Sequence, residues 1–295
     1  MIILWIASGA AAAAAVCVLT LLLIRVRRKK EVERAYRRPP EGAGAAGDLA
    51  SSIETGGGIP RLLHQVWVGK KRFPPYKAVD ALHSFDRINR DIRKLLWKDA
   101  DIDRLMQERF PELGEIYRNY RYTMQRVNLT KYMSMYAYGG VYADLDVVAR
   151  RPLAELFERH PDKGAVFFIE TVLTDEQAER IGRKNPIRKR GTELGFLGEV
   201  AEDRRRMASY LFMARPGHPL VGDMLEEARR RSALRVHYPY DIMYTSGTDL
   251  FTTVVNHRAD RYPDVLILDR SVADEYFEHI CFGSWVNFID FPFRT

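Results

Sequence analysis

Hydrophobic and polar positions divide the chain into three parts. Residues 2–24 form an apolar run that carries no charge. A helix of that length, at 1.5 Å per residue, is long enough to cross a hydrocarbon core of ~30 Å. A cleaved signal peptide has a basic start and a shorter apolar run, whereas the basic residues here follow the run. We therefore predict a retained single-span membrane anchor over residues 1–24.

The two parts that follow the anchor differ in their patterns. Residues 25–58 begin with a basic stretch and continue as a Gly/Ala/Ser-rich run without periodicity, which is typical of a flexible tether. From residue 59 onward, apolar residues recur in the patterns of strands and helices. We predict one folded domain over residues 59–295.

Short apolar runs within this domain predict strands, and periodic runs predict helices. The predicted strands cover 61–68, 92–97, 141–148, 165–169, 210–214 and 265–268. The predicted helices cover 102–110, 113–120, 123–138, 220–231 and 249–256. Residues 171–206 are highly charged and irregular, which predicts a surface insertion. Strands that alternate with helices indicate an α/β domain with a mainly parallel or mixed central sheet.

The segment 123–138 has the clearest helical period. Its apolar side chains recur at i, i+3, i+4, i+7 and i+8 and predict an apolar helical stripe, formed by Leu129, Tyr132, Met133, Tyr136 and Ala137. The Gly-Gly pair at 139–140 is expected to end this helix before the next strand.

The net charge of +7 is concentrated in one segment. Residues 25–38 hold eight Lys/Arg and two Glu, so the rest of the chain is nearly neutral. A nucleic-acid-binding domain carries its basic residues across a face of the fold, which argues against that class. The basic segment fits either contact with anionic lipid head groups or a solvated linker. Cys17 and Cys281 are the only cysteines, which excludes a disulfide scaffold and a cysteine-rich zinc site.

Asp144 and Asp146 are the most informative pair of residues. They follow the Gly-Gly pair in an apolar strand, where alternate side chains share a face. Two convergent carboxylates are hard oxygen ligands that suit Mg²⁺ or Mn²⁺, and such an ion can neutralise a departing diphosphate. Asp101 and Asp103 have the same spacing but are expected at a helix N-terminus. A solvated strand end without an ion is the alternative for the first pair.

Five ordered segments resemble one known family. The run 123–153, which contains Asp144 and Asp146, resembles the DXD-containing sugar-binding region of glycosyltransferase family 32. This group includes the yeast inositolphosphoceramide mannosyltransferases and α-1,6-mannosyltransferases. The other segments resemble the family's opening strand and its M…PGHP, TGP and H…SW elements, at 59–67, 212–220, 245–247 and 279–285. The resemblance implies a GT-A fold, a nucleotide-sugar-binding sandwich, with metal-dependent transfer that retains the anomeric configuration.

The resemblance also implies roles for single residues. Asp146 would bind the metal directly, and Asp144 would contact the donor and reach the metal through water. Trp67 would stack on the nucleotide base, which its flat ring suits; a core aromatic is the alternative.

The C-terminal element of the family closes the metal and diphosphate site. His279 is the residue there that would join the metal, and Ser284 and Trp285 would contact the donor. A histidine taken alone is more often an ordinary polar residue.

Asn128 and Lys131 depart from the family pattern, because many members have Asp and Arg at these positions. In a helix the two residues share a face, so we expect them to hold donor hydroxyls or phosphate. Asn supplies a neutral amide in place of a carboxylate, and Lys supplies a point charge in place of the bidentate guanidinium of Arg. These residues therefore do not determine the identity of the nucleotide-sugar donor. Asn128 also begins a glycosylation sequon, which we expect to be unused within the site helix.

The leading hypothesis is a membrane-anchored, retaining glycosyltransferase that uses Mn²⁺ or Mg²⁺. It would move mannose from GDP-mannose onto a membrane lipid such as inositolphosphoceramide, by direct front-face transfer. The anchor favours a lipid acceptor because tethering raises the effective concentration. Two alternatives remain: a UDP-sugar transferase acting on protein or glycan, and a catalytically dead sugar-nucleotide-binding module. No nucleic-acid partner is expected.

Two features of the sequence bear on which side of the membrane the folded domain faces. Lys/Arg next to a span tends to stay cytoplasmic, and all eight such residues follow the predicted anchor. This favours a cytosolic domain, whereas the family resemblance implies a Golgi-type membrane setting.

Overall fold

A computed structural model describes residues 16–24, 26–27, 58–68, 76–183, 186–196 and 204–281. Residues 16–24 are helical, and their apolar side chains are exposed. Among the described ranges, no helix has both the length and the apolar character to span a membrane. Residues 1–15 of the predicted anchor and almost all of the predicted linker lie outside the described residues, so the anchor stays a prediction.

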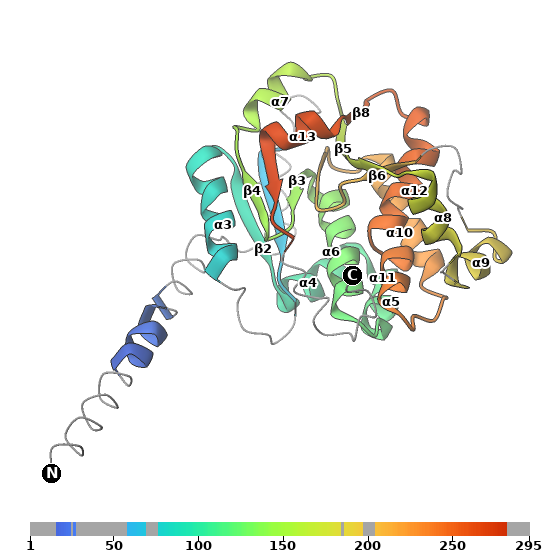
Figure 1. Ribbon diagram of the computed structural model, residues 1–295, viewed down its shortest axis with the longest axis horizontal. Coiled ribbons are helices and arrows are strands. Elements are labelled where there is room, and N and C mark those ends of the chain that lie inside the picture. Colours follow the sequence, from blue (N-terminus) through green and yellow to red (C-terminus); the bar gives the residue numbers. More distant parts are fainter. Residues whose placement is uncertain are drawn as a thin grey trace, which may run out of the picture.

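A mixed seven-stranded sheet forms the centre of the domain (Figure 1). Its strands are β1 (Leu62–Val66), β2 (Arg93–Trp97), β3 (Gly140–Ala143), β5 (Ala165–Val172), β6 (Arg205–Met207), β7 (Leu211–Ala214) and β8 (Val265–Leu268). Their order is β2-β1-β3-β7-β5-β6, and β8 pairs with β5. Strands β2, β1 and β3 run parallel, as do β5 and β8, whereas β7 is antiparallel to β3 and β5. The α/β class and the mixed sheet are confirmed.

Helices cover both faces of this sheet. One face carries α4 (Asp99–Arg109), α5 (Gly114–Asn119), α6 (Thr123–Tyr138), α10 (Pro219–Arg231) and α12 (Thr248–Arg258). The other face carries α3 (Tyr76–Ile88), α7 (Ala154–Arg159), α13 (Arg270–Tyr276) and the antiparallel pair β4 (Val147–Ala149) and β9 (Phe277–His279). Strand residues alternate between these two cores: Tyr142 and Phe212 face the first, and Val141 and Met213 face the second.

Helix α6 has the predicted bounds, and it is enclosed on several sides. It contacts β1 on one side and α4, α10 and α11 (Pro239–Thr245) on others. Polar residues outside the apolar stripe are therefore buried too, including Asn128, Thr130, Lys131 and Ser134. Burial extends beyond the predicted apolar stripe because α6 is enclosed by helices as well as by the sheet.

Helix α6 ends at the Gly-Gly pair, and β3 begins there, as predicted. Gly139 has φ 61° and ψ −169°, a combination that is essentially restricted to glycine. A Cβ on Gly139 would lie 2.5 Å from the backbone nitrogen of Pro216, and one on Gly140 would lie 2.5 Å from the carbonyl oxygen of Leu62. The backbone of β3 thus reaches its neighbours at distances that only glycine allows.

Two predicted segments differ in the structure. Residues 141–148 are not one strand, because β3 ends at Ala143 and β4 begins at Val147. Residues 171–206 are not an irregular insertion: β5 extends to Val172, α8 (Asp175–Arg183) and α9 (Pro186–Glu193) follow, and β6 pairs with β5. Many of their residues are charged, so no clear apolar period marks these elements in the sequence.

Candidate functional site

Asp144 and Asp146 lie in the turn between β3 and β4. The carbonyl of Asp144 accepts hydrogen bonds from the Val147 N–H (3.1 Å) and the Gln65 side-chain amide (3.5 Å). Strand alternation, which was the predicted reason for their convergence, is therefore wrong. The turn that follows the last β3–β7 pair, Ala143 with Leu211, brings the carboxylates together.

A third side chain joins this pair from the other end of the domain. One ligand atom each of Asp144, Asp146 and His279 lies within 4.8 Å of the others, and His279 Nε2 is 3.4 Å from Asp146 Oδ1. The pairing of β4 with β9 places His279 opposite Val147. In addition, the Ile280 N–H donates to the carbonyl of Asp146 at 3.0 Å. Two carboxylates and one imidazole are a donor set that fits Mn²⁺ and, through the oxygens, Mg²⁺.

The electrostatics of the three residues are coupled. Burial and the neighbouring Asp146 charge raise the pKa of Asp144, although Lys131 and a 2.6 Å hydrogen bond from the Tyr142 hydroxyl oppose this. Burial lowers the pKa of His279, but its hydrogen bond to Asp146 and the two carboxylate charges outweigh burial and raise it. The cluster thus attracts positive charge, as a cation site requires.

Tyr210 contacts both halves of this cluster. Its backbone carbonyl accepts the Asp144 N–H at 2.9 Å, and its ring stacks on His279 with 3.9 Å between centroids. Just before it, the Ser209 carbonyl accepts a hydrogen bond from Lys131 Nζ at 2.9 Å. The loop before β7 therefore holds the DXD turn and the C-terminal histidine in one arrangement.

Comparison with known families agrees with this geometry. Residues 74–165 match the family model described as "Glycosyltransferase sugar-binding region containing DXD motif". The predicted resemblance to the DXD-containing sugar transferases is confirmed. The Asp144–Asp146 turn lies inside the matched region.

Curated relatives share the same region. The chain is 26% identical over 207 residues to inositol phosphoceramide mannosyltransferase 3 of Schizosaccharomyces pombe, a match that covers 70% of this chain and 47% of the relative. It is 31% identical over 104 residues to inositol phosphoceramide mannosyltransferase 1 of the same yeast, covering 34% and 32%. The chain spans less than half the length of these relatives. Among solved structures, the PaToxG glycosyltransferase aligns with a TM-score of 0.43 at 10% identity, covering 82% of this chain and 80% of that one.

Asn128 and Lys131 lie within the sugar-binding region, and their polar atoms contact protein groups. Asn128 Nδ2 donates to Ser246 Oγ at 3.3 Å. The Lys131 ammonium lies 4.9 Å from the Tyr142 ring centroid; burial lowers its pKa, and the Asp144 charge opposes this. Their predicted contact with the donor stays a prediction.

Trp67 lies just after β1 and outside the matched region. It is half-buried and packs against the cluster of Leu82 and Leu96, against which Leu145, the residue between the two aspartates, also packs. This packing agrees with the core alternative, and base stacking stays a prediction. Ser284 and Trp285 lie outside the described residues.

Four residues in or next to the site were not among the predicted site residues: His64, Gln65, Tyr142 and Tyr210. Tyr142 stands two positions before Asp144, and that spacing was the available signal, because alternate strand residues share a face. His64 accepts the Trp97 indole N–H at Nδ1 (2.9 Å) and donates from Nε2 to the Gly139 carbonyl (2.7 Å). Nothing in the local sequence pattern distinguishes Tyr210.

Proposed function

We propose that this protein is a metal-dependent, retaining glycosyltransferase of the GT-A type. The carrying observation is the convergence of Asp144, Asp146 and His279 at the end of β3, within a DXD sugar-binding region. The mannosyltransferase names of the relatives support mannose as the transferred sugar, and we propose GDP-mannose as its donor. Their inositol phosphoceramide substrates support a membrane lipid as the acceptor.

Asp144, Asp146 and His279 would hold Mn²⁺ or Mg²⁺ in this proposal. When bound, the ion stabilises negative charge on diphosphate oxygens. The protein orients its ligands before the donor arrives: Tyr142 fixes the Asp144 carboxylate, and Tyr210 fixes the Asp144 backbone and the His279 ring. Such preorganisation reduces the reorganisation that the reaction needs.

Transfer with retention has a simple balance of bonds. The acceptor hydroxyl oxygen forms a bond to the anomeric carbon on the face from which the diphosphate leaves. The bond between that carbon and the diphosphate oxygen breaks, and its electron pair stays on the diphosphate. The hydroxyl proton passes to the departing diphosphate.

A panel of nucleotide sugars tests this function. The full chain is incubated with each donor, Mn²⁺ and inositolphosphoceramide vesicles, and product is analysed. We expect transfer from GDP-mannose, lost on chelation and reduced at least ~100-fold in Asp146→Asn. The matched control is Asp103→Asn, an exposed aspartate of a second Asp-x-Asp pair, which should keep full activity.

Three outcomes contradict the proposal in different ways. Turnover that survives both chelator and Asp146→Asn removes the metal role. Transfer from UDP-sugars alone supports the other donor class. Binding of nucleotide sugars without any turnover supports the inactive module.

We also propose a single-span anchor within residues 1–24, on the length of its uncharged apolar run. A Golgi-type membrane setting is proposed on the family resemblance. Protease treatment of sealed vesicles that carry the full chain tests the orientation. Protection of the domain is expected for a lumenal site, and digestion without detergent indicates cytosolic exposure.

A further inference from the structure

Helix α9 lies at the right-hand end of the domain in Figure 1, and the turn between α10 and α11 packs against it. Leu234 of this turn forms a buried cluster with Ile187 of α9 and Tyr244 of α11. The Arg230 guanidinium, at the end of α10, donates to the carbonyl of Gly195 just after α9 at 2.9 Å. The outer sides of α9 and the turn therefore form one surface, which we call the α9–α11 surface. Its exposed side chains include Lys189, Leu194, Arg235, His237 and Tyr238.

The turn before α11 alternates between the core and the solvent. Leu234 and Val236 are buried, whereas the residues that follow them, Arg235 and His237, are exposed. The backbone N–H groups of His237 and of the next residue both donate to the buried Asp241 carboxylate, at 2.8 and 2.9 Å. The backbone that presents the exposed side chains is therefore fixed at the start of α11.

Positive charge is concentrated on this surface. Residues 186–196 and 226–238 together carry a net charge of +4, whereas all other residues after residue 38 together carry −3. The folded domain is therefore nearly neutral as a whole but has a basic end. Such an end attracts an anionic surface and is repelled less by it than the rest of the domain.

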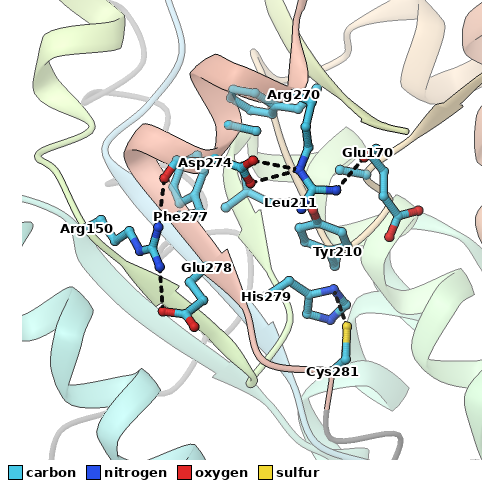
Figure 2. A pocket seen from close by; sticks show the side chains of 13 residues that line it. Arg150, Glu170, Tyr210, Leu211, Arg270, Asp274, Phe277, Glu278, His279 and Cys281 are labelled. Carbon is cyan, nitrogen blue, oxygen red and sulfur yellow. Dashed lines mark hydrogen bonds and ion pairs between the residues drawn. The ribbon is translucent and has the colours of Figure 1, made fainter. Parts of the chain in front are cut away.

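Two of the cations on this surface differ from paired cations elsewhere in the domain. In the cavity that His279 lines, for example, Arg150 bonds to Glu278 at 2.9 Å (Figure 2). Lys189 and Arg235 are exposed and have no carboxylate partner among the residues that the structure describes. Both can therefore meet an external anion without first breaking an ion pair.

Exposed apolar side chains accompany these cations. Tyr238 is 63% exposed and Leu194 is 44% exposed. They are two of the four large apolar side chains that are exposed in the described part of residues 59–295. Tyrosine is typical of the head-group level of a membrane because its ring is amphipathic. Apolar side chains beside basic ones are typical of surfaces that lie on anionic membranes.

We propose that the α9–α11 surface docks on an anionic lipid membrane. Lys189 and Arg235 contact head-group phosphates, and Tyr238 and Leu194 enter the head-group region. The inference rests on the proposed function and deepens it, because it adds a second membrane contact to the predicted anchor. The anchor holds the domain close to the membrane, which raises the effective concentration of lipid at a surface of modest charge.

Helix α11 connects this surface with the sugar-binding helix α6. The surface lies at the N-terminal end of α11, and Ser246 follows its C-terminal end. The Ser246 hydroxyl accepts from Asn128 Nδ2 at 3.3 Å, and its carbonyl accepts from the Tyr132 hydroxyl at 2.9 Å. With 7 residues, α11 is about 10 Å long. Docking therefore fixes the orientation of α6, and of the DXD turn that follows it, relative to the membrane.

Hydroxyl-radical footprinting of the full chain tests this docking. The chain is reconstituted into vesicles of phosphatidylcholine alone or of phosphatidylcholine with phosphatidylserine, and oxidation of Tyr238 and Leu194 is measured by mass spectrometry. We expect oxidation of both side chains to fall at least about threefold in the anionic vesicles, because the docked surface is shielded. The protection should decrease as the salt concentration rises.

Charge variants separate this surface from the basic segment 25–38, which can also meet anionic lipid. Lys189→Gln combined with Arg235→Gln should weaken docking about fivefold for each cation removed and abolish most of the protection. Arg87→Gln combined with Arg90→Gln is the matched control, because both arginines are exposed and lie outside the surface; it should keep full protection. Both double variants should bind GDP with Mn²⁺ within about twofold of the wild type, which also shows that they fold.

Three results would overturn the docking surface. Equal oxidation of Tyr238 in neutral and anionic vesicles would exclude docking. Full protection in the variant of Lys189 and Arg235 would assign the contact to the basic segment. Protection by inorganic phosphate, added to neutral vesicles, would make the region a site for small anions. Failure of the proposed function is distinct, because it appears as the absence of Mn²⁺-dependent GDP binding while the protection of Tyr238 is unchanged.

Discussion

The phenol ring of Tyr210 stacks on the imidazole of His279, with 3.9 Å between centroids and 27° between planes. Tyr210 lies in the loop before β7, and His279 lies in β9. Strand β9 pairs with β4, which directly follows the DXD turn. Because the Tyr210 carbonyl also accepts the Asp144 N–H, one residue positions ligands from both ends of the domain. The cation site is thus built by tertiary packing as much as by the motif.

Removing the Tyr210 ring should weaken metal binding. A stacked aromatic pair contributes about 0.5–1.5 kcal/mol, so Tyr210→Ala should raise the Kd for Mn²⁺ about 2- to 10-fold. Tyr210→Phe keeps the ring and should bind Mn²⁺ almost as the wild type does. Calorimetric titration of Mn²⁺ into each protein measures the effect. Equal Kd values for Ala and Phe would show that the stack does not position His279.

A buried ion cluster should stabilise the region around α9. Asp249, on α12, is 3% exposed and bonds to Arg188 of α9 (3.0 Å) and Arg206 of β6 (3.2 Å). Burial raises the pKa of Asp249, but the two arginines outweigh burial and hold it below its usual value. Asp249→Asn removes the buried carboxylate that Arg188 and Arg206 share, and among the described residues only the Glu170 carboxylate still pairs with Arg206. The loss should cost about 3–5 kcal/mol of unfolding free energy.

Urea unfolding of Asp249→Asn and of the exposed control Asp260→Asn measures this difference. Because the folded-state pKa of Asp249 is depressed, its stabilisation is present at neutral pH and is lost as pH falls through the acidic range. The two variants should therefore converge in stability at low pH. A constant gap at every pH would contradict the ionic origin.

His64 should make stability fall on mild acidification. It is fully buried, and its neutral form accepts the Trp97 N–H and donates to the Gly139 carbonyl. Burial lowers its pKa from 6.5 to about 4, although the bond to Gly139 opposes this. Between these values the unfolded chain takes up a proton that the folded chain does not. Stability should therefore decline by about 3 kcal/mol from pH 6.5 to pH 4.

A titration-free variant checks the source of this slope. Unfolding free energies of the wild type, His64→Gln and His237→Gln are measured by urea at pH 7 and at pH 4.5. His237 is exposed, and its variant should retain the wild-type slope. His64→Gln should be less stable at pH 7 but lose less on acidification. An unchanged slope in His64→Gln would assign the decline to other groups.

The sequence predicted most elements because their apolar patterns are local. Helix α6 begins at Thr123 and ends at Tyr138 as predicted, since a strong period precedes a Gly-Gly pair. The elements it missed are short or charged. Strand β9, for example, has three residues and exists through its pairing with β4, and such pairing between distant segments leaves no local pattern.

The candidate site shows the same division. The Asp144–Asp146 pair could be predicted from its motif, and His279 could be predicted from the resemblance of the C-terminal segment to the family. Tyr210 was not readable, because its role depends on a ring contact and a backbone carbonyl that only the folded chain brings together. Lys131 was predicted at the donor, and its bond to the Ser209 carbonyl depends on the loop that carries Tyr210.

Two glycines with the same φ should respond very differently to a methyl group. Gly139 has φ 61° and Gly217 has φ 63°, so an L-residue is strained at both. A Cβ on Gly217 meets no atom within 4 Å, whereas one on Gly139 would lie 2.5 Å from Pro216 N and 2.7 Å from the Ala214 carbonyl oxygen. Gly217→Ala should therefore cost about 1–2 kcal/mol, the backbone strain alone.

Gly139→Ala should cost at least about 3 kcal/mol, because backbone overlap adds to the strain. Since Gly139 also precedes β3, relief of the overlap must move that strand and the DXD turn behind it. Gly139→Ala should thus lower the affinity for Mn²⁺ as well as the urea midpoint, whereas Gly217→Ala should lower the midpoint alone. Equal losses of stability in the two variants, with unchanged Mn²⁺ affinity, would show that β3 accommodates the methyl group without moving the site.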